Sequence, residues 1–189
     1  MKKRNRRSVT VLLSGGMDSG GCIHFYQRRL FFIRPLFVDY GQPAAKAELK
    51  SASAICAFYK LRLHTLVVKG FNVPPSGEII GRNLMLVSCA LVHAGRSANL
   101  IAIGIHRGTT YFDCGAAFLE ICNSLLDGYA DGRTRLAAPF LNLTKSEVWT
   151  YCTESKVPLH LTWSCEASSA KPCRKCSSCK DKESLLAST

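Results

Sequence analysis

The sequence lacks any hydrophobic run long enough to cross a membrane. The longest such run, Leu84–Val92, has nine residues and already contains Ser88, whereas a membrane-spanning helix needs about 18. The basic start of the chain resembles the first part of a secretion signal. The apolar segment behind it, Val9–Leu13, is too short to be the core of such a signal. We therefore expect a cytoplasmic protein that has no membrane partner.

The sequence also has few acidic residues. Lys and Arg number 25 against 13 Asp and Glu, which gives a formal net charge of +12. A basic surface attracts nucleotides, nucleic acids or acidic proteins, but a solvated tail over residues 1–7, which holds five of the positive charges, explains much of the excess. No stripe of Lys and Arg interleaved with aromatic residues appears in the sequence. A nucleic-acid partner is therefore not favoured.

Strand-like and helix-like segments alternate five times along the chain, which has 47% apolar and 20% charged residues. The expected strands are Ser8–Leu13, Pro35–Val38, Leu61–Val68, Leu100–Gly104 and Leu136–Ala138. The expected helices are Asp18–Arg29, Pro43–Tyr59, Leu84–Gly95, Asp113–Leu126 and Thr144–Ser155, with a short tail at Asp181–Leu186. This alternation predicts an α/β fold with a doubly wound, five-stranded parallel sheet over residues 8–160. Ligands of such sheets bind at the carboxyl ends of the strands.

A glycine-containing turn joins the first expected strand to the first expected helix. Gly15 and Gly16 allow backbone N–H groups to face an anion, and the helix N-terminus adds its dipole. The alternative is an ordinary turn capped by Asp18 or Ser19. The candidate nucleotide-binding residues are Leu13, Ser14, Gly15, Gly16, Met17, Asp18, Ser19 and Gly20.

Ten cysteines are present, and four of them gather near the C-terminus. The six scattered cysteines mostly lie in apolar helical patterns, where a thiol packs as a small hydrophobic group. The spacing of the other four is C-x7-C-x2-C-x2-C. In a chain with no export signal this spacing indicates a closed, structural Zn²⁺ site rather than disulfides. Its ligands are Cys165, Cys173, Cys176 and Cys179, in a C-terminal segment expected over residues 161–189.

The turn Ser14-Gly15-Gly16-Met17-Asp18-Ser19, placed directly after the first strand, resembles the pyrophosphate-binding loop of the PP-loop ATP pyrophosphatase superfamily. The resemblance implies that ATP is cleaved between its α- and β-phosphates, with Mg²⁺ on the phosphates, and that an oxygen is activated as an adenylate. The superfamily usually has Thr or Ser where this chain has Gly20. One hydroxyl near the phosphates is therefore missing.

Four further segments resemble the 7-cyano-7-deazaguanine synthase (QueC) family. They occur in the family's order along nearly the whole chain, and they are Val38–Gln42 with Glu48-Leu49, Gly81–Leu84, Ile103-Gly104 with Tyr111–Cys114 and Phe118, and Pro139–Glu147 followed by Thr162–Cys165 and the cysteine cluster. The resemblance implies that Asp39, Tyr40 and Gln42 lie beside adenine. The alternative for Asp39-Tyr40 is a plain turn that ends the strand.

The resemblance also assigns catalytic roles to Asp18, Arg82 and Lys145. Arg82 could bind a carboxylate or a phosphate through its two-pronged guanidinium. Lys145 lies in the first turn of a helix, where a cation opposes the dipole, so a bound anion would remove the conflict. The alternative for Lys145 is an exposed side chain that points to water. Asn83 is expected as a helix N-cap.

In the resembled family, a deazapurine pocket is formed by the region after the fourth strand. The substrate-binding candidates are Arg82, Asn83, Tyr111, Asp113 and Cys114. Asp113 could accept hydrogen bonds from a guanine-like edge; the alternative is that it caps the next helix. The family has Pro after the Tyr and Arg after the Cys, whereas this chain has Phe112 and Gly115.

The family resemblance implies a homodimeric ligase that joins 7-carboxy-7-deazaguanine to ammonia and converts the amide into a nitrile. The altered pocket keeps a second possibility open, in which the acid is joined to a protein amine in antiviral defence. Two other hypotheses are a PP-loop enzyme that modifies tRNA and an inactive, zinc-stabilised nucleotide-binding module.

Overall fold

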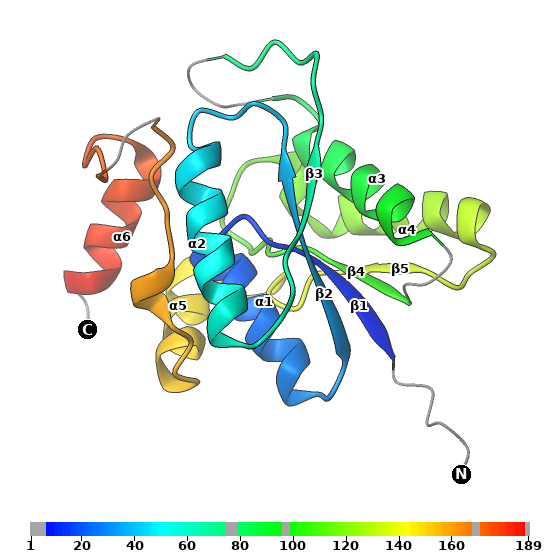
Figure 1. Ribbon diagram of the computed structural model, residues 1–189, viewed down its shortest axis with the longest axis horizontal. Helices are drawn as coiled ribbons and strands as arrows, with labels where there is room; N and C mark the ends of the chain where they lie inside the picture. The colour runs from blue at the N-terminus through cyan, green and yellow to red at the C-terminus, as the bar shows by residue number, and fades with distance from the viewer. Residues whose placement is uncertain (1–6, 75–78, 96–98, 168–170, 188–189) are drawn as a thin grey trace.

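The computed structural model describes residues 7–74, 79–95, 99–167 and 171–187 (Figure 1). Five strands form one parallel sheet in the order β3-β2-β1-β4-β5. The strands are β1 Ser8–Leu12, β2 Phe32–Asp39, β3 His64–Val67, β4 Leu100–Ala102 and β5 Arg135–Ala137. The predicted doubly wound α/β fold is confirmed. The strand order reverses between β1 and β4, so the ligand site of this architecture is expected there.

Helices cover both faces of the sheet (Figure 1). They are α1 Met17–Arg28, α2 Ala45–Phe58, α3 Arg82–Ala94, α4 Ala116–Ala130, α5 Lys145–Glu154 and α6 Ser177–Ala187. One core joins the sheet to α1, α2, α5 and α6, and a second joins its other face to α3 and α4. Within the described ranges, none of the helices has the length and apolar character that a membrane span requires.

β1 is the central strand, and all five of its residues are buried. Val9 and Val11 face the α1 and α2 core, while Leu12 faces the α3 and α4 core. A strand that is covered on both faces needs a continuous apolar run, which explains the sequence of β1. Cys22 and Cys152 are buried in the first core as free thiols, as their apolar surroundings in the sequence predict.

β2 begins at Phe32, three residues before the predicted start at Pro35. Proline cannot donate to a strand ladder, so it is confined to positions where one side of the strand is open. β3 pairs with β2 only from Leu36 onward. At Pro35, therefore, β2 has β1 on one side and no partner strand among the described residues on the other, which allows the proline.

The helix boundaries differ from the predicted ones by one to four residues, and three of these differences have a structural meaning. α3 begins at Arg82 with Gly81 as its N-cap, so the expectation that Asn83 is the N-cap was wrong. α4 begins at Ala116 and follows a short 3₁₀ turn, Phe112–Cys114. The expected C-terminal tail is part of the longer helix α6. The first two differences have one cause: the Asp113 carboxylate accepts the backbone N–H of Asn83 (3.2 Å) and holds the 3₁₀ turn against the start of α3.

The capping box predicted at the start of α5 is present. The Thr144 hydroxyl accepts the backbone N–H of Glu147 (3.2 Å), and the Glu147 carboxylate accepts the backbone N–H of Thr144 (2.6 Å). The hydrogen bonds that the Glu147 carboxylate accepts from the Thr144 N–H and from the Thr144 hydroxyl lower the pKa of Glu147. The box fixes the first turn of α5 and thereby the position of Lys145.

Two helical glycines allow a test of the packing between α1 and α5. A Cβ at Gly21 would lie 3.0 Å from Cys152 Sγ and 3.0 Å from Phe140 Cε2, whereas a Cβ at Gly128 would meet nothing within 4 Å. Gly128→Ala should raise the free energy of unfolding by about 0.5–1 kcal/mol. Gly21→Ala should lower it by about 1 kcal/mol, because overpacking outweighs the gain in helix propensity. Denaturant unfolding measures both, and equal stabilisation by the two changes would contradict this packing.

Candidate active site

A cleft of about 1000 Å³ opens at the carboxyl ends of β1, β2 and β4. Its walls come from the turn after β1, the end of β2, the starts of α3 and α5, the 3₁₀ turn before α4, and the segment Thr162–Glu166 with α6. The cleft therefore lies at the switch point of the sheet. Most of the predicted site residues come together here, although they are spread over the whole chain.

The turn after β1 is held in one conformation by contacts on the side that faces away from the cleft. Gly15 has φ +84°, and a Cβ there would lie 2.6 Å from the Glu48 carbonyl oxygen, so no other residue fits. The Gly15 carbonyl accepts hydrogen bonds from the Ser51 hydroxyl (2.8 Å) and from the backbone N–H of Trp163 (2.9 Å). Two distant segments thus fix the turn before any ligand arrives.

The upper side of the turn presents hydrogen-bond donors to the cleft. The hydroxyls of Ser14 and Ser19 lie 3.2 Å apart, and both residues line the cleft together with Gly16, Met17 and Asp18. The first backbone N–H groups of α1 have no partner within the helix, and the helix dipole is positive at this end. The arrangement suits an anion with several oxygens, such as a phosphate.

Two other glycines show how the turn is enclosed. A Cβ at Gly104, just after β4, would lie 2.8 Å from the Asp18 carbonyl carbon and 2.9 Å from the Ser19 nitrogen. A Cβ at Gly20 would point toward Ile55 and Thr162 at 3.5 and 3.9 Å. Gly15 and Gly20 are not among the lining residues of the cleft. A side chain at the Gly20 position, where the superfamily carries a hydroxyl, would therefore leave the backbone on the side of the turn that faces Ile55 and Thr162.

Lys145 lies between two carboxylates at the cleft. Its Nζ is 3.9 Å from Asp18 Oδ2 and 3.9 Å from Asp181 Oδ2. These carboxylates already offset the repulsion between the Lys145 ammonium and the α5 dipole. A bound anion is therefore not required to stabilise this cation. Asp18 Oδ1 is buried and has no hydrogen-bond partner among the described residues. Asp181 was not predicted as a site residue, because only α6 brings it to the cleft.

The end of β2 supplies a second wall. Tyr40 and Gln42 line the cleft, whereas Asp39 accepts the backbone N–H of Gly41 (3.0 Å) and forms the turn that ends the strand. The Gln42 side chain accepts the backbone N–H of Tyr40 (3.0 Å) and donates to Glu48 (2.8 Å). Gln42 therefore shapes the wall through hydrogen bonds within the protein.

Glu48 and Arg82 face each other across this wall. Burial raises the pKa of Glu48, and the guanidinium of Arg82 and the hydrogen bond from Gln42 oppose the shift. Burial also raises the pKa of Tyr40, with Arg82 again acting in the opposite direction. Glu48 was not predicted as a site residue. The available signal was its place in the segment that resembles the QueC family, six residues after Gln42.

The predicted deazapurine pocket forms the opposite part of the cleft. The buried side chain of Asn83 donates to the Asp113 carbonyl (3.0 Å) and approaches Cys114 Sγ (3.8 Å). One carboxylate oxygen of Asp113 caps α3, so the alternative that Asp113 caps the next helix was wrong. Tyr111, Asp113 and Cys114 all line the cleft, together with Arg82 and Asn83.

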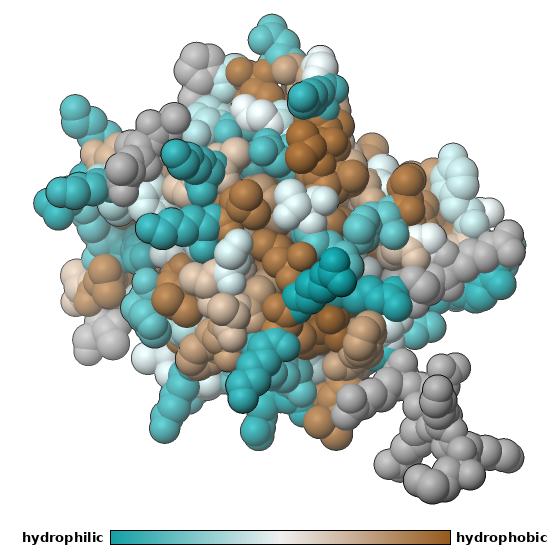
Figure 2. Space-filling model, viewed as in Figure 1, coloured by the Kyte–Doolittle hydropathy of each residue, from teal (hydrophilic) through white to brown (hydrophobic). Residues whose placement is uncertain are grey.

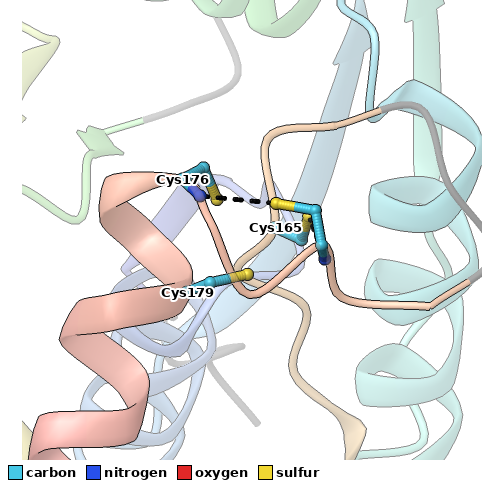
Figure 3. Close-up of side chains that lie close together, drawn as sticks. Cys165, Cys176 and Cys179 are labelled. Atoms are coloured by element: carbon cyan, nitrogen blue, oxygen red, sulfur yellow. Dashed lines mark hydrogen bonds between the residues drawn. The ribbon is translucent and has the colours of Figure 1, made fainter.

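The four C-terminal cysteines form one cluster. Their sulfur atoms all lie within 4.8 Å of one another, and Figure 3 shows the Cys165, Cys176 and Cys179 side chains pointing toward a common centre. Sulfur atoms on a tetrahedral Zn²⁺ with 2.3 Å bonds are about 3.8 Å apart. The backbone N–H of Cys173 donates to Cys165 Sγ, and the backbone N–H of Cys176 donates to Cys173 Sγ.

The chemistry of these thiols fits a metal site. Hydrogen bonds from the backbone N–H groups of Lys175 and Cys176 lower the pKa of Cys173 to about 6, whereas burial raises the pKa of Cys179 to about 12. A dication would stabilise all four thiolates together. The cluster also anchors α6, whose Leu185 joins the α1 core and whose Lys182 donates to the Thr162 carbonyl (3.4 Å). It thereby supports the wall that carries Asp181.

The fold and the turn after β1 are those of a PP-loop α/β protein. NMN synthetase from Francisella tularensis has a similar structure, with a TM-score of 0.59 and 12% identity over 97% of this chain and 78% of that chain. NH3-dependent NAD synthetase from Campylobacter jejuni has a TM-score of 0.53 and 18% sequence identity, over 85% of this chain and 69% of that chain. A 4-thiouridine synthetase in complex with RNA and ATP has a TM-score of 0.56 and 17% sequence identity, over 96% of this chain and 50% of that chain. These similarities concern the fold.

Sequence comparison narrows the class to one family. The profile described as "Queuosine biosynthesis protein QueC" matches residues 8–73 and 69–188. A 7-cyano-7-deazaguanine synthase from Prochlorococcus marinus strain AS9601 is 32% identical over 92% of this chain and 91% of that protein. One from Acetivibrio thermocellus is 30% identical over 92% and 90%. The chain belongs to the QueC family.

The cysteine cluster gives the second prediction. The protein should be purified with one zinc ion per chain, and Cys173→Ser should weaken zinc binding by roughly 100-fold or more, since it removes a ligand. Cys89→Ser is the matched control, because this half-buried thiol on α3 is not part of the cluster. Zinc content after dialysis against a chelator measures the effect. Equal zinc content in the two variants would contradict the assignment.

Proposed function

We propose that this protein is an ATP-dependent ligase that activates 7-carboxy-7-deazaguanine, couples it to ammonia and converts the amide into 7-cyano-7-deazaguanine. One observation carries the proposal: the phosphate-binding turn and the Asp113 pocket line the same cleft. A nucleotide and an organic acid can therefore meet within it. Membership of a family whose relatives are 7-cyano-7-deazaguanine synthases supports the same substrate.

ATP would lie with its β- and γ-phosphates on the Ser14–Ser19 turn. The hydroxyls and N–H groups of the turn would bind phosphate oxygens, and Lys145 would add a positive charge at the same place. The orphaned, buried oxygen of Asp18 and the neighbouring Asp181 carboxylate fit Mg²⁺, which prefers oxygen ligands. Bound Mg²⁺ would screen phosphate charge. Adenine would lie beside Tyr40 on the β2 wall.

The deazapurine acid would lie on the opposite wall. Asp113 keeps one carboxylate oxygen for the N1–H and amino groups of a guanine-like ring, because the other oxygen caps α3. Asn83 fixes the Asp113 backbone. Arg82, between the two walls, would orient the acid's carboxylate by its two-pronged guanidinium. The protein would contribute mainly alignment and charge stabilisation.

The reaction would then take place in two rounds. In the first round, a carboxylate oxygen attacks the α-phosphorus of ATP and pyrophosphate leaves. Ammonia attacks the acyl carbon, AMP leaves with that oxygen, and a proton is lost to give the amide. In the second round, the amide oxygen attacks a second ATP, again releasing pyrophosphate. Loss of AMP and of both N–H protons leaves the nitrile.

A second candidate acceptor is a protein amine. Tyr111 and Phe112, at the cleft and in the segment that departs from the family pattern, are 56% and 65% exposed. Exposed aromatic side chains at the site could contact a macromolecule that carries the amine. The first round would be unchanged, and the product would be a stable amide. The antiviral setting expected for such an enzyme stays a prediction.

The expected homodimer also stays a prediction. α4 carries exposed hydrophobic side chains one turn apart at Ile121, Leu125 and Tyr129, which are 53%, 48% and 78% exposed. Ile121 and Leu125 also line the cleft. A second copy that covers this stripe would therefore also complete one wall of the site.

The proposed activity gives the third prediction. With ATP, 7-carboxy-7-deazaguanine and ammonia, the protein should release AMP and form the nitrile, as read by mass spectrometry. Without ammonia, the nitrile should be absent. Lys145→Ala should lower the rate by roughly 100-fold, because charge stabilisation at the phosphates is lost. Lys50→Ala, an exposed change on α2, is the matched control.

Other outcomes of this assay separate the alternatives. An amide with an added protein amine, in place of the nitrile, would favour the conjugating ligase. Bound ATP without AMP release under any condition would favour the inactive nucleotide-binding module and contradict the proposed reaction. AMP release that requires tRNA instead of the deazapurine acid would favour the tRNA-modifying hypothesis.

A further inference from the structure

Positive charge is distributed very unevenly along the chain. Residues 1–112 contain 16 Lys and Arg and four Asp and Glu, whereas residues 113–189 contain nine of each. Two of those four acids, Asp18 and Glu48, line the cleft, and Asp39 ends β2 at the same end of the sheet. Little negative charge is thus left for the opposite, amino-terminal edge of the sheet.

The fold gathers basic side chains at that amino-terminal edge. β2 and β3 begin there, and α1, α2 and α3 end there, because each helix runs antiparallel to the strand before it. Figure 2, in the view of Figure 1, shows hydrophilic side chains projecting from the lower edge, with hydrophobic surface between them. The residues that we call the basic edge are Arg7, Arg28, Arg29, Arg34, Lys60, Arg62, His64 and His93.

Contacts connect the part of the basic edge that lies at the starts of β2 and β3. The Phe32 N–H donates to the Arg7 carbonyl (2.9 Å), and Arg34 follows two residues later on β2. The His64 and His93 ring centroids are 5.3 Å apart. Desolvation, then His93, Arg62 and Arg34, lower the pKa of His64, which shows that the positive groups act on one another.

Ion pairs with carboxylates do not account for most of this charge. Among the described residues, Arg7, Arg28, Arg29, Lys60 and Arg62 take part in none of the ion pairs. Two carboxylates near the end of α4, Asp127 and Asp131, pair with Arg135 and Arg133. Glu154 ends α5 at the same end of the sheet and is one carboxylate against the charge of the basic edge.

Helix dipoles explain only part of the clustering. A cation in the last turn of a helix is stabilising, which accounts for Arg28 and Arg29 at the end of α1. Arg34 lies on a strand and Arg62 on the loop before β3, where no helix C-terminus of their own provides that compensation. Like charges gathered at one edge repel one another. The clustering of these cations is therefore best explained by a ligand of opposite charge.

We propose that the basic edge binds single-stranded nucleic acid. Its charged groups are mostly arginines, whose planar guanidinium matches phosphate in two hydrogen bonds. Exposed aromatic rings lie among them: Phe32 is 50% exposed with the Arg34 guanidinium 5.3 Å from its ring centroid, and Phe58 is 54% exposed. Basic side chains with exposed rings are the features that bind unpaired bases and their backbone.

The bound strand would not be the substrate of the cleft. β2 runs from the basic edge at Phe32 to the cleft at Asp39, and these two residues are about 23 Å apart along the strand. The sequence did not favour a nucleic-acid partner, because Arg7, Arg34 and Arg62 are far apart along the chain. The inference is independent of the proposed ligase activity.

Fluorescence anisotropy with labelled 12-nucleotide oligo-U and oligo-dT tests the proposal. At low salt we expect dissociation constants of about 1–100 μM with strong salt dependence. Arg34→Ala/Arg62→Ala should weaken binding by tenfold or more and reduce the slope of log K against log salt by about 1.4. Phe32→Ala should weaken it about fivefold. Thermal unfolding checks that the variants fold.

Matched variants make the test specific. Lys46→Ala/Lys69→Ala removes the same formal charge from exposed sites at the opposite end of the sheet, at the start of α2 and after β3, and should change affinity less than twofold. Arg34→Lys/Arg62→Lys should keep most of the salt dependence even if the alanine variant does not fold. A chain without residues 1–6 should still bind the oligonucleotides.

Several results would overturn the proposal. One is the absence of binding at low salt, and another is that the control pair weakens binding as much as the double alanine variant does. A third is that binding is lost when residues 1–6 are removed but is unaffected by the double alanine variant. Tighter binding to a duplex of the same length, to polyglutamate, or to phosphatidylserine vesicles would also reject single-stranded nucleic acid as the ligand.

Discussion

The hydrogen bonds on the Gly15 carbonyl are the interaction on which the site depends. Ser51 on α2 and Trp163 near the cysteine cluster both donate to this oxygen, and the φ of +84° turns the following N–H groups and Ser14 and Ser19 toward the cleft. A phosphate-binding turn must not rearrange each time it is filled, because ordering it would subtract from binding. α2 and the C-terminal segment thus act as the support of the turn, which gives both segments a reason to pack where they do.

The cysteine cluster extends the same logic to the C-terminus. Among the described residues, Leu185 is the one member of α6 in the α1 core. A short helix of this kind has little apolar area with which to hold its position. A metal bound by Cys165 and by three cysteines at the start of α6 would provide the missing constraint. In this account the cluster keeps Asp181 beside Lys145 without itself touching the reacting atoms.

Much of the fold was readable from the sequence, because the alternation of buried strands and helices is a strong signal and the turn after β1 is distinctive. Boundaries that depend on tertiary contacts were not readable. Asn83 looked like an N-cap, but Gly81 takes that place while Asp113, thirty residues later, binds the Asn83 N–H. Asp181 was missed for a related reason, because a lone acid on a helix carries no local sign of the site that it faces and only the position of α6 beside Lys145 reveals it. Glu48 did carry a sign, its place in the segment that resembles the QueC family, but its position beside Arg82 depends on packing.

If the turn binds the leaving pyrophosphate while the acid attacks the α-phosphorus, an oxygen atom must pass from the acid to AMP. The measurement uses 7-carboxy-7-deazaguanine labelled with ¹⁸O in its carboxylate, together with ATP and ammonia, and mass spectrometry of the nucleotide products. One ¹⁸O atom is expected in each AMP formed, together with unlabelled pyrophosphate. Unlabelled AMP, or ADP with labelled orthophosphate, would show that the acid does not attack the α-phosphorus.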